Sequence, residues 1–275
     1  MAKLGFVGLG IMGTPMAGHL IAAGHEVFLN TLGQVPKELI DAGGKACVTA
    51  ADVTAEADTI FIMVPDTPQV DIDFVAAIRE AVGSEIRLMV DANCAYSENF
   101  KTALEVGRAL QDLGIYWFEE PIAPNDLEGY KRLSSALDIR IAAGEADFMA
   151  FGSRDFFRSG AIDVVQPNIS RTGGITEARR IAAMSRAFHI PYAPHTGSCS
   201  AVCLAATLQF AVSLPNFLIF EFMQSDWSKT QPNPLRHDLL KEPVEKLEDG
   251  HMVVPEGPGI GIEINMDVVD NYRMA

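Results

Sequence analysis

The stretch "LMVDAN", residues 88–93, is a short apolar run that ends on the carboxylate of Asp91. The same pattern, an apolar run followed by a polar side chain capable of chemistry, recurs along the chain. Its polar positions are Asp91, Glu119, Glu145, Asn168, His195 and Glu221, and the gaps between them are 28, 26, 23, 27 and 26 residues. A strand, a helix and two loops take up this length, and six such units fit in residues 84–240. The spacing therefore predicts a (β/α) barrel that collects these groups at the carboxyl ends of its strands.

The first 70 residues follow a different pattern. In "GFVGLGIMGTPMAGHL" (5–20), Gly8, Gly10 and Gly13 have the G-x-G-x-x-G spacing between an apolar run and a helix-like segment. Such a turn can present helix N–H groups to a pyrophosphate, although the glycines can equally serve only the turn. Further strands are expected at 26–30 and 57–65, with a helix at 36–44. We therefore predict an α/β protein with a partial Rossmann-like βαβαβ unit (1–70) and a barrel domain (71–275).

Composition narrows the classes of function. The 275 residues carry a formal charge of −15 at pH 7, which argues against partners such as nucleic acid or an anionic membrane surface. The cysteines are scattered and form no C-x-x-C pair, which indicates reduced thiols and a cytoplasmic location. They are Cys47, Cys94, Cys199 and Cys203.

The three acids at successive strand ends, Asp91, Glu119 and Glu145, predict a metal site. With no basic neighbour at the strand tips, they would repel one another unless a cation lay between them. A set made only of oxygen ligands suits Mg²⁺. Glu120 could exchange roles with Glu119, because the sequence does not show which of the two faces the inside.

The motifs "GLGIMGTPMA", "AGHEV" and "IFIMVPDTPQV" resemble the β-hydroxyacid dehydrogenases over about residues 1–70. That resemblance implies an NAD(P) site, with Thr31 where a basic residue would favour NADP. The serine–glycine and lysine segments that carry the dehydrogenase chemistry do not follow in this chain. The residues implied to surround the cofactor are Gly8, Gly10, Met12, Gly13, Asn30, Thr31, Val64 and Pro65.

From about residue 70 onward, six ordered motifs resemble the barrel of the enolase superfamily, mandelate racemase branch, near its sugar-acid dehydratases. The resemblance implies strands 3 to 8 of that barrel. It implies Mg²⁺ bound by Asp91, Glu119 and Glu145, with Asn93 nearby. The motifs are "MVDAN", "FEEP", "AAGE", "DVVQPN", "PHTG" and "FEF".

The same resemblance implies roles at the last three strand ends. His195 would be a general base or acid, Asn168 would orient its imidazole, and Glu221 would hydrogen-bond a substrate carboxylate oxygen. The Asn stands where the family has an aspartate, and it stabilises a charged imidazole less well.

The implied activity is that of a Mg²⁺-dependent lyase that dehydrates a sugar acid through an enediolate. The family's Lys-x-Lys base occurs nowhere in this sequence, and its capping domain is missing, so impaired activity is expected. Two alternatives stay open: an NAD(P)-dependent hydroxyacid dehydrogenase, and a fusion product that at most binds metal. An uncapped barrel mouth and unpaired edge strands favour a homo-oligomer.

Overall fold

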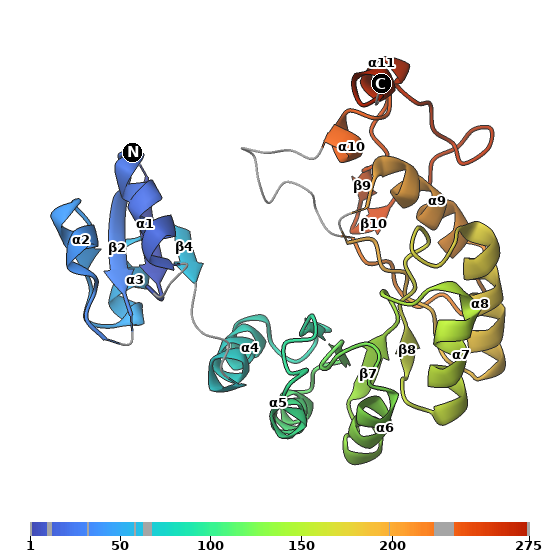
Figure 1. The fold of residues 1–275 in the computed structure, drawn as a ribbon, viewed down its shortest axis with the longest axis horizontal. Coiled ribbons are helices and arrows are strands. Elements are labelled where there is room, and N and C mark those ends of the chain that lie inside the picture. The colour runs from blue at the N-terminus through green and yellow to red at the C-terminus, as the bar shows by residue number, and fades with distance from the viewer. Residues whose placement is uncertain are drawn as a thin grey trace. The chain divides into compact units, whose positions relative to one another are not determined.

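The computed structural model describes residues 2–9, 13–31, 33–57, 59–62, 68–197, 199–222 and 234–273. The chain divides into two compact units, Met1–Val70 and Asp71–Ala275 (Figure 1). Each unit has its own sheet and its own cluster of buried apolar side chains.

The Met1–Val70 unit contains a four-stranded parallel sheet in the order β3-β2-β1-β4. The first two strands coincide with the expected ones, and β4 lies inside the expected strand 57–65. The sequence does not predict β3, because this strand is two exposed residues long and carries no apolar signal. The elements are β1 (Lys3–Val7), α1 (Gly13–Ala22), β2 (Glu26–Asn30), α2 (Lys37–Asp41), β3 (Lys45–Ala46), α3 (Ala50–Glu56) and β4 (Thr59–Ile62).

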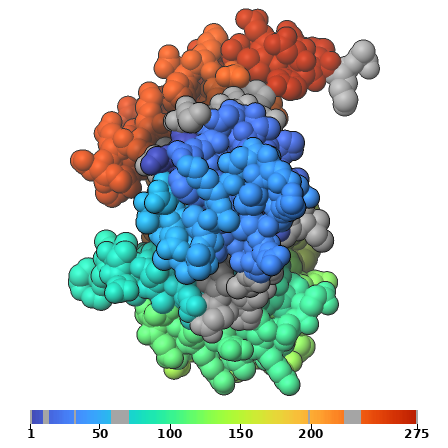
Figure 2. Space-filling model, turned by 90° about the vertical axis from the view of Figure 1, so that its left-hand side faces the viewer, coloured from blue at the N-terminus to red at the C-terminus, as the bar shows by residue number. Residues whose placement is uncertain are grey.

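The core of this unit forms where the sheet meets its helices. Phe6, Val27, Leu29 and Leu39 are buried together there, and the surface of the unit appears in blue in Figure 2. Gly8 follows β1 with φ of 95°, a backbone conformation that favours glycine, and its N–H donates to the Asn30 carbonyl at 2.8 Å. The first glycine of the fingerprint thus makes the turn from β1.

The Asp71–Ala275 unit is built on parallel strands in the order β5-β6-β7-β8. Its main elements are α4 (Pro68–Val82), β5 (Val90–Asp91), α5 (Phe100–Asp112), β6 (Trp117–Glu119), α6 (Leu127–Ala136), β7 (Arg140–Ala143), α7 (Met149–Ser159), β8 (Val164–Val165), α8 (Ile175–Ala187) and α9 (Ala201–Ala211). The C-terminal region adds α10 (Pro234–His237), the antiparallel pair β9 (Leu247–Glu248) and β10 (His251–Met252), and α11 (Met266–Asn271).

Two isolated parallel bridges extend this row of strands: Val165 pairs with Tyr192, and Tyr192 pairs with Phe217. The periodicity predicts full strands there, but Pro191 and Pro194 flank Tyr192 and lack the N–H that a ladder needs. The row therefore supplies the six strand positions that the periodicity predicts. The last four polar positions, Glu145, Asn168, His195 and Glu221, lie in loops beyond the paired residues rather than on the strands themselves.

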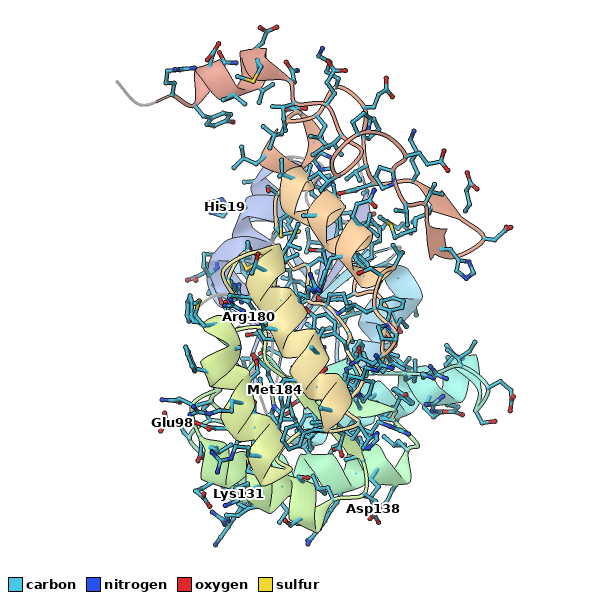
Figure 3. The ribbon with its side chains drawn as sticks, turned by 90° about the vertical axis from the view of Figure 1, so that its right-hand side faces the viewer. His19, Glu98, Lys131, Asp138, Arg180 and Met184 are labelled. Atoms are coloured by element: carbon cyan, nitrogen blue, oxygen red, sulfur yellow. The ribbon has the colours of Figure 1, made fainter. Side chains whose placement is uncertain are left out.

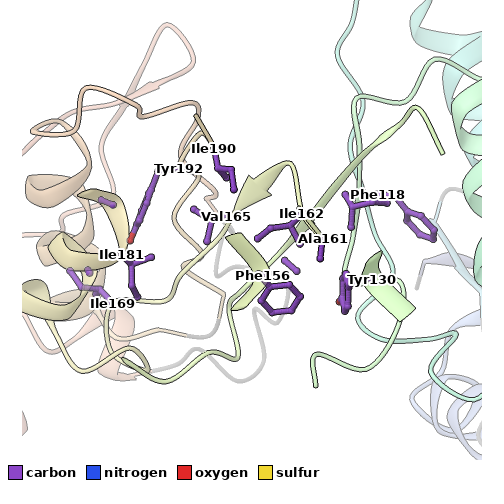
Figure 4. Packing of buried hydrophobic residues seen from close by; sticks show 14 of the residues in the cluster. Phe118, Tyr130, Phe156, Ala161, Ile162, Val165, Ile169, Ile181, Ile190 and Tyr192 are labelled. Atoms are coloured by element: carbon purple, nitrogen blue, oxygen red, sulfur yellow. The ribbon is translucent and has the colours of Figure 1, made fainter. Parts of the chain in front are cut away.

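Helices α5 to α9, the strands and the loops between them all contribute side chains to the large apolar core beside this sheet. The rings of Tyr130 and Phe156 meet edge to face with centroids 5.2 Å apart (Figure 4). The Phe118 ring centroid lies 6.1 Å from that of Tyr96. A smaller cluster of Trp117, Ala142, Val164 and Ala193 lies apart from that core. Because side chains alternate along a strand, Trp117 and Phe118 face opposite sides of the sheet.

Helices α7 and α8 are also joined by a polar contact. A carboxylate oxygen of buried Glu177 accepts a hydrogen bond from the Ala150 N–H at 3.2 Å, and its other oxygen pairs with Arg180 one turn along α8. Arg180 is labelled on this helix in Figure 3. Among the described residues, no helix is both long and apolar enough to cross a membrane.

Candidate active site

Asp91 and Glu119 lie next to each other at the carboxyl edge of the sheet. They are the last residues of β5 and β6, and the parallel register pairs them directly. The Asn93 N–H donates to Asp91 Oδ1 at 2.8 Å, and Trp117 Nε1 donates to Glu119 Oε2 at 3.2 Å. Paired residues of parallel strands point to the same face, so the two carboxylates share one side.

The structure distinguishes Glu119 from Glu120, although both are buried. Glu119 is on the same side of β6 as Trp117, the side away from the helices. Glu120 follows the strand with φ of 36°, and its Oε2 accepts a hydrogen bond from Cys94 Sγ at 3.4 Å. Its Oε1 is buried and has no hydrogen-bond partner within the described residues.

Glu145 connects three loops that follow the strands. Its Oε1 accepts from Arg171 Nη1 at 2.9 Å, and its Oε2 lies 3.0 Å from His195 Nε2. The expectation that no basic group stands among these acids is therefore wrong. Arg171 comes from the loop that begins at Asn168, so the same periodicity could have indicated it.

Asn168 holds the other side of the imidazole. Its Nδ2 is 2.9 Å from His195 Nδ1, and both side chains are buried. The Asn168 Oδ1 accepts three hydrogen bonds: from the Ser170 N–H at 3.0 Å, the Ser170 hydroxyl at 2.6 Å and the Arg171 N–H at 3.3 Å. The loop backbone thus fixes the orientation of this amide.

Glu221 is tied to the segment that follows Tyr192. Its Oε2 accepts from the Thr196 N–H at 3.0 Å, and its backbone carbonyl accepts from the Thr196 hydroxyl at 2.5 Å. This contact places Glu221 beside the loop that carries His195.

Burial raises the pKa values of three carboxylates of the site. Burial, with repulsion from neighbouring carboxylates such as Asp91, raises the pKa of Glu119 to about 8 and that of Glu120 to about 7. Burial also raises the pKa of Asp91. Each of these groups therefore resists ionisation unless a positive charge compensates it.

For Glu145 and His195 the pKa shifts favour the charged forms instead. Burial by itself raises the pKa of Glu145, but the hydrogen bonds and charges of His195 and Arg171 outweigh it, and this pKa is lowered. Burial works against the imidazolium, but the hydrogen bond to Glu145 and the charge of Glu221 outweigh it, so the pKa of His195 is raised.

The donor types at this edge fit a hard cation. Asp91, Glu119 and Glu145 offer carboxylate oxygens, and buried like charges are relieved by a divalent ion. Within the described part of the chain, no three His, Cys, Asp or Glu side chains are already arranged around a metal position. Metal binding would therefore need the carboxylates to close up, with Glu145 giving up or sharing a present partner.

Two of the residues predicted to surround NAD(P) form hydrogen bonds within the Met1–Val70 unit. Asn30 Nδ2 donates to the carbonyls of Cys47 and Val48, both at 3.1 Å, and Thr31 Oγ1 accepts from the Leu9 N–H at 3.3 Å. Gly13 begins α1. The remaining predicted residues Gly10, Met12, Val64 and Pro65 lie outside the described residues.

Fold and site together define an α/β protein whose parallel strands bring acidic groups to one edge. Residues 45–268 match the family described as enolase C-terminal domain-like, and the chain belongs to that family. The matched region begins inside the Met1–Val70 unit and so includes α3 and β4.

Two curated relatives show the range of named activities. The chain is 35% identical over 212 residues to D-galactarolactone cycloisomerase of Agrobacterium fabrum, which covers 74% of this chain and 53% of that protein. It is 36% identical over 205 residues to arabinonate dehydratase of Saccharolobus solfataricus, covering 74% and 52%. The chain thus spans about half the length of these relatives.

Solved structures give the same assignment. A putative mandelate racemase from Bordetella bronchiseptica, complexed with 2-oxoglutarate and phosphate, matches with a TM-score of 0.68 and 29% identity. That match covers 100% of this chain and 63% of the other. The 3,6-anhydro-D-galactonate cycloisomerase of Zobellia galactanivorans matches with a TM-score of 0.66 and 27% identity, covering 98% and 65%.

Proposed function

We propose that this chain catalyses the Mg²⁺-dependent dehydration of a sugar acid, an aldonate or aldarate. The observation that carries the proposal is the direct register of Asp91 with Glu119, with Glu145 and His195 in contact beyond the next strands. The relatives named as dehydratases support the reaction class. The row of strands from β5 to Phe217 would correspond to strands 3 to 8 of a (β/α) barrel.

In this proposal Asp91, Glu119 and Glu145 hold the metal. When bound, Mg²⁺ would supply positive charge that binds the substrate carboxylate and offsets the negative charge that develops on it. Glu119 is the better candidate of the adjacent glutamates, because its side chain is on the Asp91 side of the sheet. Glu120, tied to Cys94, would shape the pocket.

The cationic and imidazole groups would act on the substrate. Arg171 is half-exposed beside Glu145, so its guanidinium can also reach an anionic oxygen. His195 presents Nε2 to the same carboxylate, and this atom would face the substrate oxygen that leaves as water. Glu221, held by Thr196, would accept a hydrogen bond from the substrate carboxyl region.

The direct test incubates the purified chain with galactarate, galactonate or tartrate, with Mg²⁺ or with EDTA. We expect at least one acid to give its dehydrated keto acid, seen by proton NMR, only when Mg²⁺ is present. Mg²⁺ binding without any product from a broader set of aldonates and aldarates would contradict the proposal.

A second candidate is nucleotide binding by the Met1–Val70 unit. The order β3-β2-β1-β4 and the left-handed turn at Gly8 favour a Rossmann-like half-domain. Isothermal titration with NADPH, with NADH and with Mg²⁺ separates the candidates. Heat from Mg²⁺ alone supports the lyase, heat from nucleotide alone supports a dehydrogenase-type site, and no heat from either favours an inactive fusion.

A further inference from the structure

Gln166 carries a buried amide that has no role in the reaction proposed above. The residue directly follows β8 and is only 1% exposed. Within the described part of the chain, neither its Oε1 nor its Nε2 has a hydrogen-bond partner of ordinary geometry. Because buried polar atoms without partners reduce the stability of the fold, a residue with two such atoms calls for an explanation.

The neighbours of Gln166 show which side of the sheet its side chain occupies. Val164 lies in the small cluster with Trp117, whereas Val165 lies in the large core. The Gln166 N–H donates to the Ala143 carbonyl at 2.9 Å, so the pairing of β8 with β7 continues past the last residue of β8. Side chains alternate along a strand, and Gln166 therefore shares the side of Trp117.

The strand between Gln166 and Glu119 leaves room for the two side chains to approach each other. On this side, β7 presents Ala142, which pairs with Glu119, and Gly144 follows the strand. Neither residue carries an atom beyond Cβ. The Gln166 amide interacts with the Glu119 carboxyl and lowers its pKa, although burial has the larger and opposite effect. An amide stabilises the charged carboxylate when its N–H group faces the carboxylate oxygens.

We propose that Gln166 is a positioning residue whose amide N–H orients the Glu119 carboxylate toward Asp91 when Mg²⁺ is bound. The inference rests on the proposed function and deepens it. Trp117 Nε1 donates to Glu119 Oε2 at 3.2 Å, and a second donor would fix the rotation of the carboxylate. Hydrogen bonds of this kind orient the ligands of a metal. The unpaired amide is then a cost to the fold of the metal-free chain that is offset in the loaded site.

The substitution Gln166→Met separates this role from a structural one, because the two roles predict opposite changes in stability. Methionine is unbranched, like glutamine, but has no amide. The metal-free variant should unfold at a higher urea concentration than the unsubstituted chain, since two unpaired buried atoms are removed. Its Kd for Mg²⁺, measured by isothermal titration, should rise by about 10- to 100-fold, as for other residues that support metal ligands. Gln166→Leu repeats the test with an apolar side chain of a different shape.

The matched control is Gln111→Met on α5, where the amide is paired. Gln111 Oε1 accepts from the N–H groups of Asp138 at 2.6 Å and Ile139 at 3.3 Å. The same substitution therefore removes hydrogen bonds that the fold uses. It should lower the urea midpoint and leave the Kd for Mg²⁺ unchanged.

NMR of the side-chain amides gives a direct signature of the proposed contact. The Gln166 amide signals, assigned by their absence in Gln166→Met, should shift when Mg²⁺ is added to the full chain. Signals that do not respond to Mg²⁺, or an unchanged Kd in both Gln166 variants, would overturn the proposal. Lower urea midpoints in both variants would also overturn it, because the amide would then be structural. None of these measurements depends on turnover, so the expected results without dehydration would contradict only the proposed function.

Discussion

The two units of this chain are both built from parallel strands and helices, but they use their polar residues differently. In the Met1–Val70 unit, Asn30 and Thr31 bond to nearby backbone and so hold its loops together. In the Asp71–Ala275 unit, Glu119 and Glu120 are buried with like charges close by, which is costly without a compensating role. In the first unit the first glycine of the fingerprint forms the turn after β1, and Asn30 and Thr31 bond to backbone groups. In the second unit the candidate site is identified by carboxylates that are buried at a cost in free energy.

Glu119→Gln should have the largest effect on Mg²⁺-dependent turnover. Glutamine keeps the shape but removes the charge that a metal requires, so turnover should fall by well over the roughly 100-fold seen for residues that only support metal ligands. Turnover and Mg²⁺ titration measure this. Glu248→Gln, on the exposed β9, is the matched control and should change neither. Full turnover in Glu119→Gln would show that the carboxylate at the end of β6 is not part of the metal site.

This contrast also shows what sequence could predict. The spacing of polar residues after apolar runs located the ends of β5 and β6 and the loops that follow the later strand positions, because a repeated strand–helix unit has nearly constant length. It did not show that Arg171 pairs with Glu145, since a loop's path depends on contacts such as the Asn168 Oδ1 network.

Side-chain direction was the other missing element. Glu119 and Glu120 are adjacent, and the register of β5 with β6 and the burial of Phe118 in the large core show which one faces Asp91. Likewise β3 has no apolar pattern, and it joins β2 through backbone pairing and through Lys45, which forms an ion pair with Glu26 and lies over the Phe28 ring. Elements defined by burial were predictable, whereas those defined by backbone pairing or loop contacts were not.

The stability of the metal-free Asp71–Ala275 unit should depend on pH. The pKa of Glu119 is about 8 and that of Glu120 about 7 in the folded chain, against 4.5 for an ordinary glutamate. Between these values the folded state binds more protons than the unfolded state, so stability is full below about pH 4.5 and is lost as the pH rises through about 8. Urea unfolding followed by tryptophan fluorescence at several pH values should show this decrease. Saturating Mg²⁺ should reverse it, and a flat profile without metal would contradict the buried carboxylates.

Substituting one tightly packed glycine in each unit tests how well each unit can accommodate an added methyl group. A Cβ on Gly44 would lie 2.8 Å from the Leu39 carbonyl oxygen, and one on Gly107 would lie 2.5 Å from Leu137 Cδ1. The backbone oxygen cannot move aside easily, so Gly44→Ala should destabilise the first unit by about 1–3 kcal/mol. In Gly107→Ala the leucine can shift, and alanine's helix preference offsets up to about 1 kcal/mol. Hydrogen exchange measures the stability of each unit separately. A larger loss of stability for Gly107→Ala than for Gly44→Ala would contradict this prediction.

The smallest expected effect tests whether the first unit takes part in catalysis. Thr49 and Asp52 form a reciprocal cap on α3, and Asp126 caps α6 by accepting from the Gly129 N–H at 2.9 Å. Thr49→Ala and Asp126→Ala should each cost about 1 kcal/mol and raise hydrogen exchange only in their own helix. We expect Thr49→Ala to leave Mg²⁺-dependent turnover unchanged, because α3 carries none of the acidic groups of the site. The family match nevertheless begins at residue 45 and includes α3. A fall in turnover for Thr49→Ala at unchanged Mg²⁺ affinity would therefore show that the two units work together, and the contrast between them would then hold only for their polar contacts.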